Sequence, residues 1–211
     1  MAGDPDEPLP AADHYFTPRP RSASRPREVR FLYRGQILVF AIDAGLFATH
    51  GLDPGTALLI EDLVLRPTDR VLDLGCGWGP IGVAAARQAV NGHVVLTDVN
   101  RRAVWVSRRN LRTNHITNAE VRPGSFFAPV AQDRFDVIAT NPPYHAGRPA
   151  ILRMLEEAPA HLVPGGHLLM VGKGSQGIRF YQAQLEAGWP VEVTVRGRGG
   201  GYRVLDAVAP G

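Results

Sequence analysis

The sequence predicts an α/β fold built on a mostly parallel β-sheet that closes with an antiparallel hairpin. From Arg70 onward, short apolar runs alternate with segments of helical length, which is the pattern of repeated βαβ units. The last two apolar runs have no helical segment between them, so they can pair only as an antiparallel hairpin. A glycine-rich turn follows the first run of the series, where open α/β sheets bind their ligands.

Length and composition are those of one ordinary globular domain. The chain has 211 residues, of which 45% are hydrophobic, enough for a full α/β sheet with its own core. Its formal net charge of +3 is mildly basic and is compatible with a polyanionic partner. The single cysteine excludes an internal disulfide, and no residue spacing resembles a zinc site. No run has the length of a membrane span or the apolar core of a signal peptide, so we expect a cytoplasmic protein.

The N-terminal part divides into a tail and the start of the domain. Residues 1–26 are rich in proline and charge and hold too few apolar groups for a core, so we interpret them as a flexible, basic tail. One domain then covers residues 27–211. It begins with a β-hairpin over residues 27–42, because a turn at Arg34-Gly35 separates two β-rich runs.

The remaining elements follow in order. Residues 43–56 are interpreted as a loop, and the leucines of Ala57–Leu63 recur at helical spacing. The parallel strands are expected at Arg70–Leu74, His93–Thr97, Ala119–Arg122, Asp136–Ala139 and His167–Val171. The helices between and after them are expected at Pro80–Ala89, Arg101–Thr113, Pro149–Leu162 and Ser175–Ala187, with Asn100 as an N-cap. The closing hairpin comprises Val191–Arg196 and Tyr202–Val208.

The glycine-rich turn lies in the run Val71-Leu72-Asp73-Leu74-Gly75-Cys76-Gly77-Trp78-Gly79. Its spacing is G-x-G-x-G and not the G-x-G-x-x-G expected for a pyrophosphate. Gly75 can adopt a positive φ, and the glycines let the backbone approach a ligand closely. A carboxylate at Asp73 would repel a pyrophosphate and attract an ammonium group. Asp98 ends the next strand, about 20 residues on, where an acidic side chain can accept the hydroxyls of a ribose.

A second motif, Asn141-Pro142-Pro143-Tyr144, directly follows the fourth parallel strand. The amide oxygen of Asn141 and the carbonyl of Pro142 can both accept N–H hydrogens from a planar amino group. The ring of Tyr144 can stack on the plane that carries that group, and this role needs the ring face but not the hydroxyl. The motif therefore predicts a site for a planar substrate that bears an NH2 group.

The two motifs, in this order, resemble those of the class I methyltransferases, which use S-adenosylmethionine (SAM). The tetrad matches the [Asn/Asp/Ser]-Pro-Pro-[Tyr/Phe/Trp] signature of enzymes that methylate an amino nitrogen conjugated to a ring or a carbonyl. The chain is further similar to the "methyltransferase small" family, whose best-known members methylate guanine N2 in small-subunit ribosomal RNA. The segments that carry this similarity are Asp13–Thr17, the N-terminal hairpin, Asp43–Phe47, Gly51–Thr56 and Gly200–Val204. The bacterial ribosomal enzymes usually carry a duplicated N-terminal half that this sequence does not show.

The resemblance implies a Rossmann-like fold with a mostly parallel, seven-stranded sheet, an antiparallel C-terminal hairpin and an additional N-terminal β-hairpin. It implies SAM as the cofactor and no metal. The catalytic residues that match are Asn141, Pro142, Pro143 and Tyr144. The matching cofactor-binding residues are Asp73, Gly75, Cys76, Gly77, Asp98, Val99, Asn100, Ser125, Phe126 and Asn141.

Individual roles follow from the same resemblance. Asp73 is expected to bind the ammonium group of SAM and Asp98 its ribose hydroxyls. Ser125 is expected to bond the adenine amino group, although family members often carry an acidic residue there, and Phe126 is expected to pack on the ring. Phe127 can equally belong to the core.

The implied reaction is the SAM-dependent methylation of an exocyclic amino group, with guanine N2 of ribosomal RNA as the first candidate. Two other acceptors are possible, glutamine N5 of a protein, as in release-factor methylation, and adenine N6. A third alternative is a module that binds SAM or RNA without turnover.

Arginines that interleave with aromatic residues near the N-terminus favour contacts with RNA phosphates. These are Arg19, Arg21, Arg25, Arg27, Arg30 and Arg34, and a second set on one predicted helix is Arg101, Arg102, Arg108, Arg109 and Arg112. The sequence leaves the oligomeric state open, with a monomer as the starting assumption.

Overall fold

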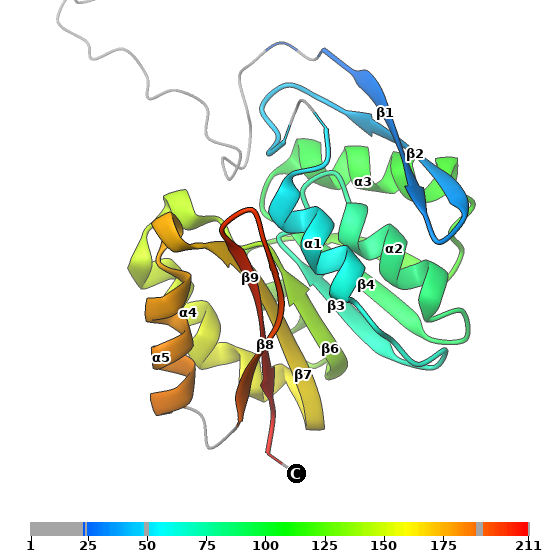
Figure 1. The fold of residues 1–211 in the computed structure, drawn as a ribbon. Coiled ribbons are helices and arrows are strands. Elements are labelled where there is room, and N and C mark those ends of the chain that lie inside the picture. The colour runs from blue at the N-terminus through cyan, green and yellow to red at the C-terminus, as the bar shows by residue number, and fades with distance from the viewer. Residues whose placement is uncertain (1–22, 24, 49–50, 189–191, 211) are drawn as a thin grey trace, which may run out of the picture.

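A computed structural model describes residues 23, 25–48, 51–188 and 192–210 of the chain. These residues form a seven-stranded sheet with helices on both faces and a separate two-stranded hairpin beside it (Figure 1). The tail expected over residues 1–26 lies outside the described residues except for Ala23, Arg25 and Pro26. The backbone amide of Arg25 donates to Asp43 Oδ1 at 2.6 Å. Among the described residues, no helix combines the length and the apolar character that crossing a membrane requires.

The strands are β1 (Arg27–Tyr33), β2 (Gln36–Ile42), β3 (Arg70–Leu74), β4 (His93–Asp98), β5 (Ala119–Pro123), β6 (Phe135–Thr140), β7 (Leu162–Lys173), β8 (Val193–Gly199) and β9 (Tyr202–Val208). The α-helices are α1 (Pro54–Asp62), α2 (Pro80–Gln88), α3 (Arg101–Thr113), α4 (Arg148–Glu157) and α5 (Ile178–Gly188). Short 3₁₀ helices occupy η1 (Ala128–Val130), η2 (Tyr144–Ala146), η3 (Ala158–His161) and η4 (Gly174–Gln176).

The sheet confirms the predicted fold class. Its strand order is β5-β4-β3-β6-β7-β9-β8, and the first five strands run parallel to one another. Strand β9 lies antiparallel to both β7 and β8, as expected for a closing hairpin. Two hydrophobic cores result, one beneath α1, α2 and α3 and the other beneath α4 and α5. The order changes direction between β3 and β6, which places a ligand-binding crevice at the carboxyl ends of these strands.

Several predicted boundaries are wrong. The helix expected to begin at Ser175 begins at Ile178, after the 3₁₀ helix η4. Helix α1 begins inside the predicted loop, because Asp53 caps it by accepting a hydrogen bond from the amide of Thr56 at 2.9 Å, and Pro54 occupies its first turn. The helix predicted over Pro149–Leu162 ends at Glu157, and a 3₁₀ turn leads straight into β7. Pro159 has no N–H for the i→i−4 bond, so it favours this change. Strand β7 therefore starts five residues before the predicted His167.

The closing hairpin is longer than predicted. The sequence suggested a turn of five residues, whereas β8 continues to Gly199 and only Gly200 and Gly201 form the turn. Both have positive φ, 55° and 82°, which suits a two-residue hairpin turn. A register shift between Val195 and Gly197 accommodates the extra length. Residue 191, where the strand was expected to begin, lies outside the described residues.

The N-terminal hairpin is joined to α3 by two buried asparagines. The side chain of Asn110 accepts from the amide of Ala41 (2.7 Å) and donates to the carbonyl of the same residue (2.8 Å). Asn114 makes the same pair of bonds with Val39, at 3.0 and 2.7 Å. The two side-chain amides thus form with the backbone of β2 the hydrogen bonds that a neighbouring strand would form. Asn110 also donates to the carbonyl of Trp78 at 2.8 Å, which ties the hairpin to the turn after β3.

Replacing Asn110 with alanine is expected to lower the free energy of unfolding by about 2–3 kcal/mol, since buried polar groups of Ala41 and Trp78 lose their partner. Urea denaturation measures this change. Arg112, exposed on the same helix, is the matched control, and its replacement with alanine should change stability by less than about 0.5 kcal/mol. Equal losses in the two variants would contradict the assigned role of Asn110.

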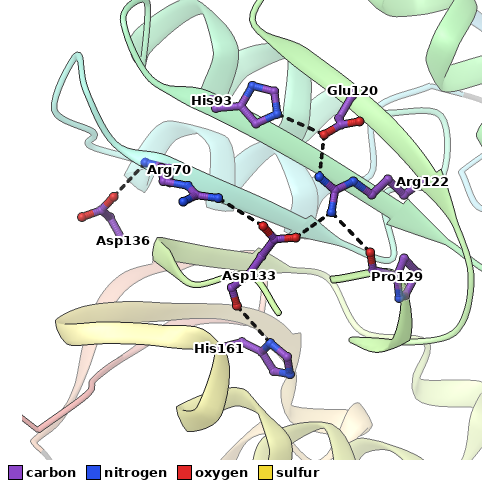
Figure 2. A network of polar contacts seen from close by, with 8 residues as sticks. All are labelled: Arg70, His93, Glu120, Arg122, Pro129, Asp133, Asp136 and His161. Atoms are coloured by element: carbon purple, nitrogen blue, oxygen red, sulfur yellow. Dashed lines mark hydrogen bonds and ion pairs between the residues drawn. The ribbon is translucent and has the colours of Figure 1, made fainter. Parts of the chain in front are cut away.

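A network of charged side chains ties the loop before β6 to β3 and β5 (Figure 2). Asp133 accepts from Arg70 at 3.2 Å and from Arg122 at 2.6 Å, and Arg122 also pairs with Glu120 at 2.6 Å. The hydrogen bond from Arg122 lowers the pKa of the Glu120 carboxyl. Pairs this exposed contribute little stability each. They connect the loop before β6 to two neighbouring parts of the sheet, β3 and β5.

Candidate active site

A cavity of about 280 Å³ opens at the carboxyl ends of β3, β4 and β6. The predicted site residues that line it are Gly75, Cys76, Gly77, Asp98, Val99, Ser125, Phe126, Asn141, Pro142, Pro143 and Tyr144. Two predicted residues, Asp73 and Asn100, do not line it. The topology thus brings the glycine-rich turn and the Asn-Pro-Pro-Tyr segment, far apart in the sequence, to the lining of one cavity.

The turn after β3 presents backbone to this cavity. Gly75 and Gly77 both have positive φ, 76° and 58°, and a Cβ added at either would meet nothing within 4 Å. The amides of Gly75 and Cys76 both donate to the carbonyl of Thr97 at 2.9 Å, which fixes the turn against β4. The open space in front of the two glycines is therefore room for a ligand in contact with the main chain.

Asp98 lies at the end of β4, where the sequence predicted an acceptor for two hydroxyls. Its two oxygens accept from the amides of Gly77 (2.9 Å) and Asn100 (2.7 Å). Each carboxylate oxygen has a second lone pair, so the group keeps acceptor capacity for a vicinal diol in the cavity. Burial raises the pKa of Asp98 to about 6, despite these hydrogen bonds.

Asp73 lies behind the cavity wall. It is fully buried, and its Oδ2 accepts from the amide of Gly82 at 2.8 Å, in the first turns of α2. Among the described residues, its Oδ1 has no hydrogen-bond partner. Burial, together with the nearby charge of Asp98, raises the pKa of Asp73 to about 7. Asp73 thus holds α2 against the turn, and its contact with an ammonium group stays a prediction.

Asn100 is also buried and does not line the cavity. Its Oδ1 accepts from the amide of Arg102 at 2.9 Å and caps α3 as predicted. Its Nδ2 donates to the carbonyl of Gly45 at 3.2 Å. The cap thereby anchors the segment that carries Leu46 and Phe47, and both of these residues line the cavity. Asn100 thus contacts the loop that borders the cavity, and its own contact with a ligand stays a prediction.

The amide of Asn141 is oriented by two residues of the α1 N-terminus. Its Nδ2 donates to Asp53 Oδ2 at 3.1 Å and to Thr56 Oγ1 at 2.9 Å. A carboxylate can only accept, so the amide nitrogen must face Asp53, and Asn141 Oδ1 is left as an acceptor at the cavity wall. Tyr202 donates to the other oxygen of Asp53 at 3.3 Å. Sequence analysis missed Asp53 and Thr56, although the Asp-Pro pair before an apolar helix is a recognisable N-cap signal.

The two prolines shape a tight bend after β6. The amide of Tyr144 donates to the carbonyl of Pro142 at 2.8 Å, and Pro143 has φ −74° and ψ 75°, the geometry of an inverse γ-turn. One lone pair of the Pro142 carbonyl is therefore used within the turn, and the second remains for a ligand. The bend holds this carbonyl and the side chain of Asn141 at the same cavity wall.

The hydroxyl of Tyr144 has a structural role that the sequence analysis did not anticipate. It donates to the carbonyl of Val171 at 2.8 Å, and the ring lies 6.0 Å from that of Tyr181. Gly172 leaves the room for this hydroxyl, since a Cβ there would collide with it. The hydroxyl thus helps to fix where the ring lies, and the expectation that substrate binding needs only the ring face of Tyr144 stays a prediction.

The segment after β5 forms another part of the wall. Ser125 and Phe126 line the cavity, and Phe126 has a positive φ of 45°, which is uncommon for an aromatic residue. Phe127 is buried and stacks on His161 with ring centroids 4.4 Å apart, so it belongs to the core. In the described part of the chain, no group of three or more His, Cys, Asp or Glu residues could hold a metal ion.

Comparison with known proteins supports the interpretation of both motifs. The model of the methyltransferase small domain family matches residues 38–206. "Uncharacterized protein YbxB" of Bacillus subtilis (strain 168) is 32% identical over 198 residues, which are 93% of this chain and 98% of that protein. Ribosomal RNA small subunit methyltransferase C of Hamiltonella defensa is 39% identical over 131 residues, which are 60% of this chain.

A solved structure with similar architecture is the T. thermophilus 16S rRNA N2 G1207 methyltransferase (RsmC) in complex with AdoMet and guanosine. It superposes with a TM-score of 0.75 at 27% identity and covers 89% of this chain. The match extends over only 51% of that chain, and the match to the Hamiltonella enzyme over 38% of it. The present chain thus spans about half the length, or less, of these ribosomal RNA enzymes.

Proposed function

The chain belongs to the methyltransferase small domain family and is a SAM-dependent methyltransferase, and we propose that it methylates the exocyclic N2 amino group of guanine in RNA. Ribosomal RNA of the small subunit is the proposed substrate class, supported by the names of the relatives from Hamiltonella defensa and T. thermophilus. The observation that carries the proposal is the Asn141 amide, whose nitrogen is engaged by Asp53 and Thr56 so that its oxygen remains to accept an N–H at the cavity.

The cofactor half of the cavity offers the chemistry that SAM requires. Its Asp98 carboxylate can accept the two ribose hydroxyls, and the backbone of Gly75 and Gly77 leaves room for close approach. Ser125 and Phe126 line the wall where the adenine is expected. Thr97 also lines the cavity, and its buried Oγ1 has no hydrogen-bond partner among the described residues. When bound, SAM supplies an electrophilic methyl group on its sulfonium sulfur.

The acceptor half is suited to a weakly nucleophilic nitrogen. The lone pair of a guanine amino group is delocalised into the ring, so the nitrogen must be polarised before it can attack. Asn141 Oδ1 and the carbonyl of Pro142 can accept its two N–H hydrogens and localise that lone pair. The Tyr144 ring, fixed by its bond to Val171, lines the same wall and can stack on the base. Positioning and local electrostatics then supply the rate acceleration, without a strong base.

Incubation with radiolabelled SAM and separate pools of small-subunit ribosomal RNA, DNA and release factor tests the proposed substrate. Nucleoside analysis of the labelled RNA is expected to give N2-methylguanosine. Label in N6-methyladenine, or in a glutamine of the release factor, would reassign the acceptor within the same reaction class. Parallel reactions on naked RNA and on assembled small subunits identify the form that the enzyme accepts.

Replacing Asp53 with serine is expected to lower kcat about tenfold or more, because Asn141 loses the acceptor that orients its amide. Serine retains the N-cap of α1, so the fold and the SAM dissociation constant should remain unchanged. Single-turnover methylation at saturating SAM measures the effect, with calorimetry for SAM binding. The matched control is Glu61→Ala, an exposed acid on the same helix, which should be silent. A parallel loss of SAM affinity in Asp53→Ser would mean that the substitution disturbs the cavity as a whole.

A further inference from the structure

Three arginines meet beside the closing hairpin, outside the cavity described above. Arg198 of β8 and Arg203 of β9 are directly paired in the antiparallel ladder, and Arg179 approaches from α5. Partial desolvation and the positive charges of Arg179 and Arg198 lower the pKa of Arg203. We call these residues the arginine triad. Figure 1 shows β8 and β9 at one edge of the sheet, next to α5.

Within the described part of the chain, no carboxylate pairs with any of the three guanidinium groups. Other arginines do have such partners, including Arg122 with Asp133 and Arg196 with Asp206. Like charges directly opposite one another in a β-ladder are destabilising. The three guanidinium groups repel one another, and within the described residues no carboxylate neutralises them. A bound anion would relieve this repulsion, so the triad is suited to bind one.

The arginine triad borders a hollow in the surface. The arginines line a hollow of about 450 Å³ together with Gly174, Gly199 and Gly201. A Cβ added at Gly174 would meet nothing within 4 Å, so the hollow is open at this residue. Guanidinium groups bind phosphate oxygens in a bidentate manner. At the rim, the ammonium of Lys173 lies 5.4 Å from the centre of the Tyr202 ring and adds a fourth positive charge.

The hollow adjoins the acceptor half of the cavity. Tyr202 lines the hollow, and its hydroxyl donates to Asp53, the residue that orients Asn141. The connection after β7 also joins the two, since Gly174 lines the hollow and Gln176 lines the cavity. Gln176 is held in place by a bond from the amide of Lys173 to its Oε1 at 2.7 Å. A strand whose base enters the cavity would thus have its neighbouring backbone within reach of the triad.

We propose that Arg179, Arg198 and Arg203 bind backbone phosphates of the RNA strand that carries the methyl acceptor. This inference rests on the proposed function, because it assumes that the acceptor base belongs to a polynucleotide. Phosphate contacts position a strand without reading its sequence, so the triad sets the register of the RNA and leaves base choice to the cavity. It differs from the phosphate contacts expected at the α3 arginines, of which Arg102 and Arg108 already donate to the carbonyls of Ala44 and Val121.

The test is the salt dependence of binding to a fluorescently labelled single-stranded RNA, measured by anisotropy for the wild type and for the triple variant Arg179→Gln, Arg198→Gln, Arg203→Gln. Each lost phosphate contact should reduce the log–log salt slope by about 0.7, so the triple variant should lose roughly two units and bind at least tenfold more weakly at low salt. The control is the double variant Arg101→Gln, Arg112→Gln, which removes charge from exposed positions of α3 and should lose less than half as much slope.

Two further measurements keep the outcomes separate. The SAM dissociation constant of the triple variant should match the wild type, since the triad does not line the cavity. Its unfolding temperature should be no lower than that of the wild type, because the substitutions remove charges that repel one another. An unchanged slope and affinity in a folded triple variant would overturn the inference, whether or not the wild type methylates RNA. Conversely, triad-dependent RNA binding without N2-methylguanosine as product would uphold the inference and contradict the proposed acceptor.

Discussion

Replacing Asn141 with alanine is expected to lower turnover by roughly 100- to 1000-fold, the usual effect of removing one preorganised polar partner of a reacting group. The variant should bind SAM within about twofold of the wild type, because no cofactor contact depends mainly on this amide in the proposed mechanism. Single-turnover methylation of RNA at saturating SAM measures the rate, and calorimetry measures the affinity. An Asn141→Ala enzyme within a few-fold of the wild-type rate would contradict the mechanism whatever the substrate.

A swap of the Asn141–Asp53 pair sharpens this test. The tetrad signature allows Asp at the first position, but in this chain the side chain at position 141 must donate to Asp53. Asn141→Asp should therefore be nearly inactive at neutral pH, since two carboxylates would face each other. The double variant Asp53→Asn, Asn141→Asp restores one donor and one acceptor and should recover part of the lost rate. If the double variant recovers no activity and Asp53→Asn alone has the wild-type rate, Asp53 does not orient Asn141.

Replacing Asp98 with alanine is expected to raise the SAM dissociation constant by about 100-fold or more. Two charge-assisted bonds to the ribose hydroxyls would be lost, each worth about 1.5–3 kcal/mol. The amides of Gly77 and Asn100 would also lose their acceptor, which loosens the turn that forms the cofactor half. Calorimetry at pH 7.5 measures the change. Glu120→Ala, an exposed acid on the neighbouring strand, should leave the affinity unchanged and serves as the control.

The raised pKa of Asp98 predicts a pH dependence with a definite sign. Burial raises the pKa of Asp98 to about 6, so below pH 6 the protonated carboxyl is a poorer acceptor and SAM affinity should fall, toward tenfold per pH unit. Asp98→Asn should flatten this profile between pH 5 and about 7. A wild-type profile that is already flat over this range would contradict the assignment of Asp98 to the ribose.

The same carboxyls affect the stability of the cofactor-free protein. Asp98 and Asp73 have pKa values near 6 and 7 in the folded protein, above the value of about 3.9 for an unfolded aspartate. Between about pH 4 and pH 7, the folded state therefore binds more protons than the unfolded state. The contribution of these two carboxyls to the free energy of unfolding is largest below about pH 4. As the pH rises through 6 and 7, their contribution is lost.

The sequence by itself determined the elements that depend on local pattern. The apolar run Arg70–Leu74 and the helix Arg101–Thr113 have the predicted bounds, because apolar periodicity and the Asn100 cap are properties of neighbouring residues. The G-x-G-x-G turn and the Asn-Pro-Pro-Tyr segment were also recognisable, since each is a continuous stretch whose chemistry is evident from its residue types. The order of these stretches along the chain was sufficient to predict the parallel sheet and its closing hairpin.

Only the tertiary structure decided which side chains meet. Asp53 lies 88 residues before Asn141, and the arginine triad combines three separate elements, so neither arrangement leaves a local signal. The structure also shows that Asp73 is fully buried beneath α2 and does not line the cavity, because strand register and the approach of α2 determine which face of a strand end is covered. Local sequence fixes secondary structure through backbone preference and apolar spacing. The site depends on contacts between distant segments, which are set only when the strands pair in register and the helices pack on them.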